Sequence, residues 1–192
     1  MRYVIPVLIL GLVSCASLNP ERYENHPYVL DYTVSPKFNP DSIGTVAVFS
    51  RLEGAPEPSL DKVAYDAAAL QLLKTGKIDV VDRARVEDIL KEQEFSHSGF
   101  VDQKTAVRLG KLLGARAVLF LDFINFEEDM DSYTVRVNAK LIDVETGRIL
   151  YVASALGGGW DIETAVSDAV KRALKPLLNR AIPGEGQRMD RE

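Results

Sequence analysis

Cys15 is the only cysteine in the chain, and it directly follows an apolar N-terminal segment. That segment has one early arginine, a largely apolar run over residues 4–13 and a small residue, Ser14, just before the cysteine. This layout is typical of a secretory signal, and about ten apolar residues are too few to span a bilayer about 30 Å thick. The position argues against a buried or catalytic cysteine, because a leader supplies no fold around the sulfur.

The ending Leu12-Val13-Ser14-Cys15 resembles the bacterial lipoprotein signal. The resemblance implies a signal peptide recognised through Leu12, Val13 and Ser14, and fatty chains such as palmitate on Cys15. Each buried methylene contributes about 0.8 kcal/mol, so several chains make the anchor nearly permanent. In the lipoprotein class an aspartate after the cysteine marks retention in the inner membrane. The alanine that follows Cys15 here therefore implies an outer-membrane protein that faces the periplasm.

The remaining residue types offer little for catalysis. With Cys15 lipidated, no thiol is left for a disulfide, thiol catalysis or a zinc–thiolate site. Of the two histidines, His26 lies among prolines and His97 lies in a Ser-His-Ser-Gly loop, where the serines are too close in sequence to suggest a catalytic triad. The chain also lacks a Gly-x-Ser-x-Gly elbow and a phosphate-loop lysine. We expect no enzyme activity, no cofactor and no metal centre.

Charged residues favour structural roles. The acidic run 127–131 lacks the spacing of an EF-hand loop, so we interpret it as a solvated hairpin turn. The charged residues Arg83, Arg85, Glu87, Asp88 and Lys91 favour ion pairs on a helix surface; a polar partner-binding patch is the alternative. The net charge of −5 becomes −6 when Arg2 leaves with the signal peptide. A mildly acidic chain argues against nucleic acid as a partner.

The chain divides into four parts. Residues 1–14 are the signal peptide, residues 15–42 a lipidated tether, residues 43–182 one α/β domain and residues 183–192 a polar flexible tail. Four prolines interrupt the tether and bias it toward extended conformations. The apolar residues at 28–34 favour partial ordering of the tether, against the domain or against a partner.

The first half of the domain alternates strands and helices. The apolar spacing predicts strands at 43–50, 78–81 and 117–126, with helices at 59–75, from Asp82 and from Asp102. The 59–75 helix is expected to turn Val63, Ala67, Leu70 and Leu73 inward. The helix from Asp102 is expected to bury Ala106, Leu109, Leu112 and Leu113.

The second half predicts two antiparallel strands and a last helix. Residues 133–141 alternate apolar and polar, which is typical of a half-exposed strand. A hairpin with Gly147 at positive φ leads to a return strand at 149–156. We interpret Gly157–Gly159 as a flexible connection, with Asp161 as the N-cap of the final helix, and leave Trp160 open between core and surface. The order β-α-β-α-α-β-β-β-α predicts an α/β (α+β) fold, a single mixed β-sheet with helices packed on it.

Three segments carry a resemblance to a known family. They are Asp79-Val-Val-Asp-Arg-Ala-Arg-Val-Glu-Asp-Ile-Leu-Lys-Glu-Gln93, Ala106-Val-Arg-Leu-Gly-Lys-Leu-Leu-Gly-Ala-Arg-Ala-Val-Leu119 and Asp143-Val-Glu-Thr-Gly-Arg148. Together they resemble the CsgG/LpoB family of bacterial outer-membrane lipoproteins, and the likeness covers about residues 43–181. The TolB amino-terminal domain shares this architecture.

The resemblance implies two functions. LpoB proteins are adapters that reach a class A penicillin-binding protein and stimulate peptidoglycan synthesis. CsgG proteins are oligomeric channels that export curli subunits, and each protomer adds two membrane-spanning hairpins, about 40 residues in all. The connections here, 127–132 and 143–148, are short. We therefore expect an LpoB-like regulator of cell-envelope assembly, with a CsgG-like secretion component as the alternative; the docking surface and a homo-oligomer stay open.

Overall fold

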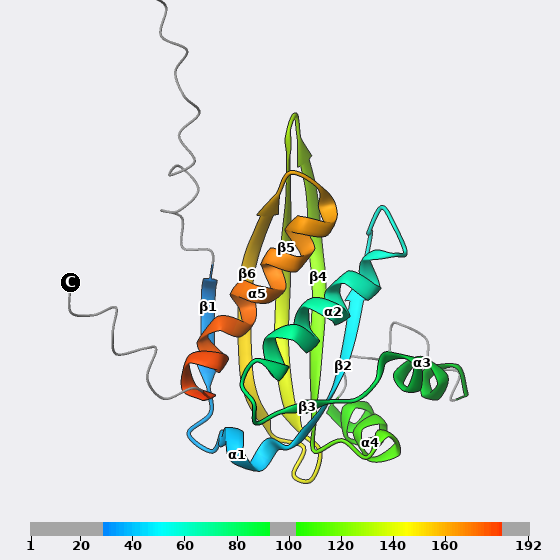
Figure 1. Ribbon diagram of the computed structural model, residues 1–192, viewed down its shortest axis with the longest axis vertical. Coiled ribbons are helices and arrows are strands. Elements are labelled where there is room, and N and C mark those ends of the chain that lie inside the picture. The colour runs from blue at the N-terminus through cyan, green and yellow to red at the C-terminus, as the bar shows by residue number, and fades with distance from the viewer. Residues whose placement is uncertain (1–28, 93–102, 182–192) are drawn as a thin grey trace, which may run out of the picture.

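The computed structural model describes residues 29–92 and 103–181 (Figure 1). They form one mixed sheet of six strands in the order β1-β6-β5-β4-β2-β3. The strands are β1 (Val29–Val34), β2 (Thr45–Leu52), β3 (Asp79–Val80), β4 (Ala117–Asp129), β5 (Ser132–Asp143) and β6 (Ile149–Gly159). The helices are α1 (Pro40–Ile43), α2 (Leu60–Leu73), α3 (Arg83–Glu92), α4 (Gln103–Leu113) and α5 (Ile162–Ala181). The predicted fold class is confirmed.

The two faces of the sheet carry separate cores. β2 pairs in parallel with β3 and β4, whereas β4, β5, β6 and β1 pair antiparallel. The larger core joins α2 and α5 to one face, along which α5 is buried from Ile162 to Ala181. A smaller core joins α3 and α4 to the other face, around Phe49 and Val118. The helices before and after β3 therefore lie on opposite faces of the sheet.

The buried stripe of α2 differs from the predicted one. Leu70 and Leu73 are 55% and 53% exposed, so their predicted inward position is wrong. The helix instead buries a stripe of three alanines and two leucines: Leu60, Ala64, Ala67, Ala68 and Leu72. Alanines let a helix axis approach its neighbours closely, so α2, which contacts both β2 and α5, presents this alanine-rich stripe to them and leaves Leu70 and Leu73 in solvent.

The same correction applies to α4. Leu112 is exposed, whereas Gly110 is buried. A Cβ on Gly110 would lie 2.2 Å from Cγ2 of Val144, which shows how closely this turn of the helix lies on the sheet. The close contact at Gly110 fixes the rotation of α4 and directs Leu112 outward.

β1 adds a strand that the expected element order lacks. The prolines around Val29–Val34 place it in the tether, yet it pairs antiparallel with β6 at the edge of the sheet. The segment continues through Phe38, which packs into the larger core, and into α1, where Asn39 Oδ1 accepts a bond of 3.0 Å from the Asp41 amide. The apolar residues of this segment therefore order against the domain.

Candidate interaction surfaces

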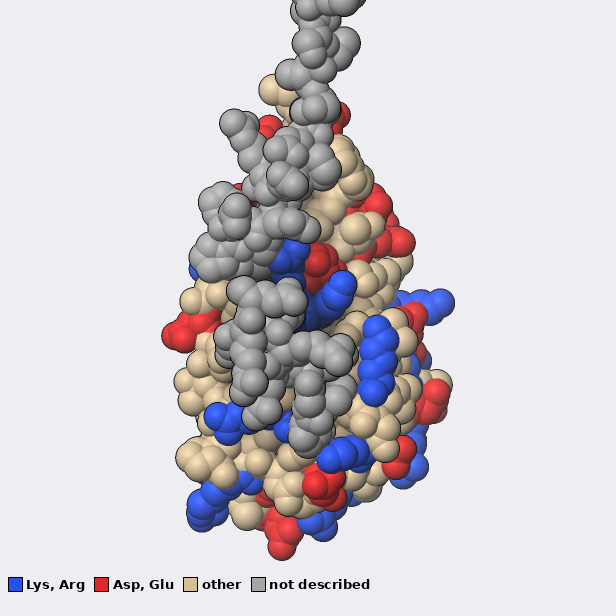
Figure 2. All heavy atoms as spheres, turned by 60° about the vertical axis from the view of Figure 1, so that its left-hand side comes forward, with Lys and Arg blue, Asp and Glu red and all other residues tan. Residues whose placement is uncertain are grey.

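The β4–β5 hairpin extends beyond the other strands at one end of the molecule (Figure 1). β4 continues past its predicted end through an irregularity between Ile124 and Glu127, where Asn125 has φ of 54°. The turn is therefore tighter than the predicted acidic turn. We name this end the acidic tip and define it by these residues: Glu57, Glu127, Glu128, Asp129, Met130, Asp131, Trp160 and Asp161. Figure 2 shows acidic side chains along the upper end of the molecule, with Lys and Arg side chains lower down.

Tyr133 lies near carboxylates from three segments of the acidic tip: the β4–β5 hairpin, the residues before α2 and the residues before α5. Its hydroxyl donates a bond of 2.9 Å to Glu128 Oε1. That hydrogen bond raises the pKa of Tyr133 above its ordinary value, and the negative charges of Glu128, Glu57 and Asp161 add to the effect. Because Glu57 precedes α2 and Asp161 precedes α5, carboxylates from the hairpin and from two helix starts share one region.

Trp160 and Met130 are exposed at the acidic tip. Trp160 is 78% exposed and Met130 is 98% exposed, the highest values among the exposed large hydrophobic residues of the described chain. Trp160 directly follows Gly159, which pairs with Tyr133 across the sheet. The sequence left open whether Trp160 lies in the core or on the surface, and the structure places it on the surface.

Gly157–Gly159 is strand rather than a flexible connection, so that interpretation is wrong. The three glycines end β6 and pair with residues 133–135 of β5. A Cβ on Gly157 would lie 2.2 Å from the carbonyl oxygen of Ala165 in α5. The Gly158 amide donates a bond of 3.0 Å to Asp168 Oδ2, which also accepts from Arg172 Nε at 2.5 Å. Gly157 and Gly159 have no room for a Cβ because α5 lies directly on this part of the strand.

Asp161 caps α5, as predicted. Its Oδ1 accepts a bond of 2.7 Å from the Thr164 amide, and its Oδ2 accepts one of 2.9 Å from the Thr164 hydroxyl. The amide bond is the main cause that lowers the pKa of Asp161. Trp160 is therefore held between a paired strand and a capped helix.

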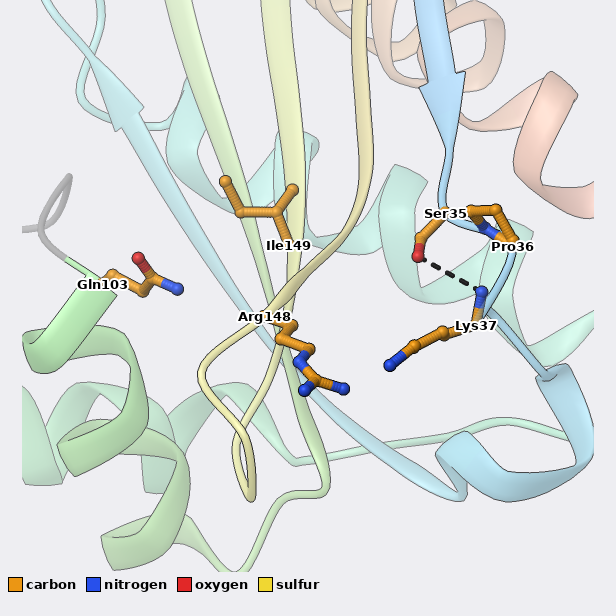
Figure 3. A pocket seen from close by; sticks show the side chains of 6 residues that line it. All are labelled: Ser35, Pro36, Lys37, Gln103, Arg148 and Ile149. Atoms are coloured by element: carbon orange, nitrogen blue, oxygen red, sulfur yellow. Dashed lines mark hydrogen bonds between the residues drawn. The ribbon is translucent and has the colours of Figure 1, made fainter.

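A cationic hollow lies at the other end of the sheet (Figure 3). It has a volume of about 570 Å³ and is lined by six residues: Ser35, Pro36, Lys37, Gln103, Arg148 and Ile149. Lys37 follows β1 and Arg148 belongs to the β5–β6 hairpin, and both side chains extend into the same space. Neither forms an ion pair with another described residue. The hollow is open and could receive an anionic group.

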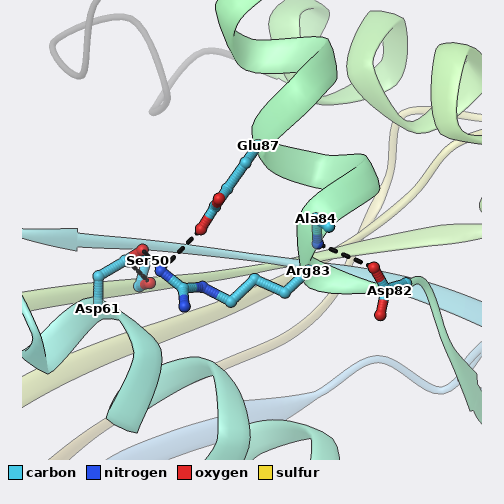
Figure 4. A network of polar contacts seen from close by, with 6 residues as sticks. All are labelled: Ser50, Asp61, Asp82, Arg83, Ala84 and Glu87. Carbon is cyan, nitrogen blue, oxygen red and sulfur yellow. Dashed lines mark hydrogen bonds and ion pairs between the residues drawn. The ribbon is translucent and has the colours of Figure 1, made fainter.

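Ion pairs join the starts of α2 and α3 (Figure 4). Arg83 lies between Asp61 of α2, at 3.4 Å, and Glu87 of α3, at 2.7 Å. Ser50 at the end of β2 donates to Asp61 Oδ1. Asp82 Oδ1 accepts a bond of 2.9 Å from the Ala84 amide, so its predicted N-cap role is confirmed. Of the predicted helix-surface ion pairs, the one between Arg83 and Glu87 is present, whereas Arg85, Asp88 and Lys91 take part in none of the described ion pairs.

This network occupies the place where open α/β sheets commonly bind ligands. β2 and β3 are adjacent, and the connections that follow them cross opposite faces of the sheet, which makes the crevice at their carboxyl ends a topological switch point. Here the ion pairs of Arg83 with Asp61 and Glu87 occupy this crevice. The arrangement favours a structural role over ligand binding.

A polar row crosses the sheet face that α3 and α4 leave uncovered. Arg51 donates two bonds of 2.6 Å to the carboxylate of Asp122. This hydrogen-bonded pairing raises the pKa of Arg51. A hollow of about 200 Å³ beside the pair is lined partly by Lys140 and Val152. One row further, Nε of Arg136 is buried without a hydrogen-bond partner. The Arg51–Asp122 pair therefore has a structural role on this face of the sheet.

The sequence-predicted site residues lie outside the described part of the chain. This applies to Leu12, Val13, Ser14 and Cys15, and also to His26, His97 and the predicted N-cap Asp102. Within the described ranges, no group of three or more His, Cys, Asp or Glu side chains is arranged to hold a metal ion. The helices described here also include none long and apolar enough to cross a membrane.

The fold occurs in other solved structures. The PelC dodecamer from Paraburkholderia phytofirmans aligns with a TM-score of 0.52 at 18% identity, over 77% of this chain and 95% of that chain. Lipoprotein GNA1162 from Neisseria meningitidis aligns with a TM-score of 0.50 at 19% identity, over 71% of this chain and 96% of that chain. At these identities the likeness establishes the fold, a one-sheet α/β domain.

The sequence also matches a family model. Residues 62–154 match the model of the peptidoglycan-synthase activator LpoB. The match supports the LpoB half of the CsgG/LpoB resemblance and not the CsgG half. No curated protein matches the chain. The matched residues run from α2 to the middle of β6; they include the β4–β5 hairpin and end before Trp160.

Proposed function

We propose that the protein is an LpoB-like regulator that binds a peptidoglycan synthase and stimulates it. The observation that carries the proposal is the match of residues 62–154 to the peptidoglycan-synthase activator family. A class A penicillin-binding protein is the synthase expected from the family resemblance. The proposed activity is protein recognition rather than catalysis.

The described surface supports recognition. Many of its polar side chains are engaged in structural pairs, such as Arg51 with Asp122 and Arg83 with Glu87. Two ends of the sheet nevertheless present groups that a partner can use: exposed Trp160 with its carboxylates at the acidic tip, and Lys37 with Arg148 at the cationic hollow. Aromatic anchors and complementary charges are the groups that protein interfaces use most effectively.

The proposed anchor is a lipid on Cys15 at the periplasmic face of the outer membrane, after removal of residues 1–14. An anchored regulator and a synthase that reaches the same periplasmic layer meet at a high effective concentration. A contact of modest affinity is then sufficient. The lipid contributes confinement, and the α/β domain contributes recognition.

The test combines binding and activity. The full-length protein in detergent is mixed with each class A penicillin-binding protein of the same bacterium, and complex formation and the rate of glycan polymerisation are measured. We expect one synthase to bind and to polymerise faster. A protein that binds none of the synthases and accelerates none contradicts the proposal.

A Cys15→Ala variant separates the anchor from recognition. We expect it to lose labelling by radioactive palmitate and to leave the membrane fraction. In detergent solution it should still stimulate the synthase, because both proteins are then free in one phase. Palmitate labelling that survives the substitution would contradict the assignment of Cys15. Light scattering of the same samples determines whether the regulator acts as a monomer.

A further inference from the structure

We propose that the acidic tip is the docking surface, and that Trp160 inserts against a cationic surface of the partner protein. The inference rests on the proposed function, because it names the face that meets the synthase and the chemistry of the face that it meets. It concerns a residue outside the family match, which ends at 154.

The first step is the exposure of two large apolar side chains at one end. Single exposed apolar residues are common, but Trp160 (78% exposed) and Met130 (98% exposed) are the two most exposed large hydrophobic residues of the described chain, and both lie at this end. Neither residue belongs to either core. Tryptophan is also among the residue types most enriched in the side chains that dominate binding energy.

The second step is the rigid support of Trp160. Gly159, just before it, pairs with Tyr133. Asp161, just after it, caps α5 through two bonds to Thr164. Binding therefore orders few additional backbone torsions at Trp160, and this lowers the entropy lost on association.

The third step is charge. The acidic tip carries six carboxylates and no lysine or arginine: Glu57, Glu127, Glu128, Asp129, Asp131 and Asp161. None of the six takes part in a described ion pair. Their negative charge lies at the same end of the molecule as Trp160 and Met130.

These observations select the occupant. An aromatic face beside carboxylates is the chemistry that binds Arg and Lys side chains, through cation–π contact and charge-assisted hydrogen bonds. An anionic membrane surface is disfavoured because it repels the same carboxylates. The occupant is therefore a basic protein surface, and we assign it to the synthase.

Fluorescence tests the inference directly, because Trp160 is the only tryptophan in the chain. The full-length regulator is titrated with the stimulated synthase, with every synthase tryptophan replaced by fluoro-tryptophan that does not emit. We expect the emission of Trp160 to shift to shorter wavelength and its quenching by iodide to fall severalfold. A synthase that binds while the emission and quenching of Trp160 stay unchanged overturns the inference and leaves the proposed function intact.

A matched pair of variants gives an independent measurement. Trp160→Ala should weaken synthase binding about tenfold or more, as expected for a central aromatic anchor. Tyr32→Ala is the control, since Tyr32 is an aromatic that is 53% exposed on β1, away from the tip; it should bind as the unchanged protein does. Equal losses in both variants, or no loss in Trp160→Ala, overturn the inference.

Two outcomes identify a different occupant. A blue shift that grows with the concentration of the regulator alone, together with light scattering from a larger species, would assign the tip to a second copy of the chain and overturn the assignment to the synthase. A blue shift on vesicles of anionic lipid without synthase would assign the tip to the membrane and overturn it equally. Failure of every synthase to bind contradicts the proposed function instead.

Discussion

The two hairpin ends of the sheet use the same residue types for different purposes. At the acidic tip, Gly157 has an ordinary backbone conformation, and its missing Cβ makes room for the backbone of α5. At the cationic hollow, Gly147 has φ of 68°, and a Cβ would meet its nearest atom, Cγ2 of Val107, at 3.5 Å. Gly157 is required because a side chain would not fit against α5, and Gly147 is required because its φ angle is unfavourable for other residues.

The charged groups differ in the same way. Asp143 at the hollow end uses its Oδ1 to accept two bonds of 2.6 Å from Thr146, which closes the β5–β6 turn. The carboxylates of the acidic tip have no ion pair within the described chain, and they lie at the same end as two exposed apolar side chains. The hollow end thus uses its carboxylate to shape the turn and presents unpaired cations, whereas the tip presents unpaired carboxylates beside apolar side chains.

The largest expected effect is a loss of stability when Gly157, which lies against α5 next to the acidic tip, gains a side chain. Gly157→Ala places a methyl group 2.2 Å from backbone atoms of α5, so the helix must shift. We expect the free energy of unfolding, measured with urea, to fall by about 3 kcal/mol. Gly158→Ala is the control, because its Cβ would approach only the Tyr133 carbonyl oxygen, at 3.9 Å. A loss as large for Gly158→Ala as for Gly157→Ala would show that strand flexibility, not packing, requires these glycines.

Charge reversal compares the two ends in binding. Asp129→Lys combined with Asp131→Lys should weaken synthase binding about tenfold at low salt, and the difference should shrink as salt screens the charges. The opposite reversal at the hollow, Lys37→Glu with Arg148→Glu, should change affinity by less than about twofold. If the hollow variant binds more weakly than the tip variant, the docking surface is at the other end of the sheet.

Substitution of Gly147, whose φ angle is positive, should give a smaller loss of stability. Gly147→Ala keeps enough space for its methyl group but forces an L-residue to φ of 68°. We expect the free energy of unfolding to fall by about 1 kcal/mol. Gly147→Asn should lose less, because asparagine tolerates this conformation better. Equal losses for alanine and asparagine would contradict a torsional origin.

The smallest effect concerns the helix cap beside Trp160. The folded-state pKa of Asp161 is lowered, so its charge stabilises the fold above the unfolded pKa of about 3.9, and this contribution disappears as pH falls through the folded pKa. The difference in Tm between the unchanged protein and Asp161→Ala should therefore be full near neutral pH and decrease below about pH 4. Near neutral pH, the Tm of Asp161→Asn should lie closer to that of the unchanged protein than the Tm of Asp161→Ala does. A constant difference down to strongly acidic pH would contradict a charged cap.

Much of the fold could be predicted because its signals are local. The alternation at 133–141, the cap residues Asp82 and Asp161, and the positive φ of Gly147 depend on neighbouring residues, and all are present. The rotation of α2 and α4 could not be predicted from leucine spacing. It depends on which small residues, such as Ala64 and Gly110, are pressed against a neighbouring element.

The interaction surfaces depend on contacts that span the chain. Three consecutive glycines from Gly157 indicate a flexible connection, because sequence does not show that α5 returns onto its own preceding strand. Glycine inside a strand often marks a site where another backbone approaches closely. That rule is the sequence signal that could have predicted the continuation of the strand through these glycines. The grouping of Glu57 with Asp161 follows from the packing of α2 beside α5 on one face of the sheet, which only the structure provides.

The placement of β1 limits the reach of the proposed anchor. Because the sheet takes up Val29–Val34, a lipid on Cys15 would leave only residues 15–28 between the bilayer and the folded body. Fully stretched, that segment is at most about 50 Å long. Under the proposed function, the synthase can then meet the regulator only as far from the membrane as this segment and the folded domain together extend, and lengthening the segment with Gly-Ser repeats should widen the layer of periplasm in which the two proteins can meet.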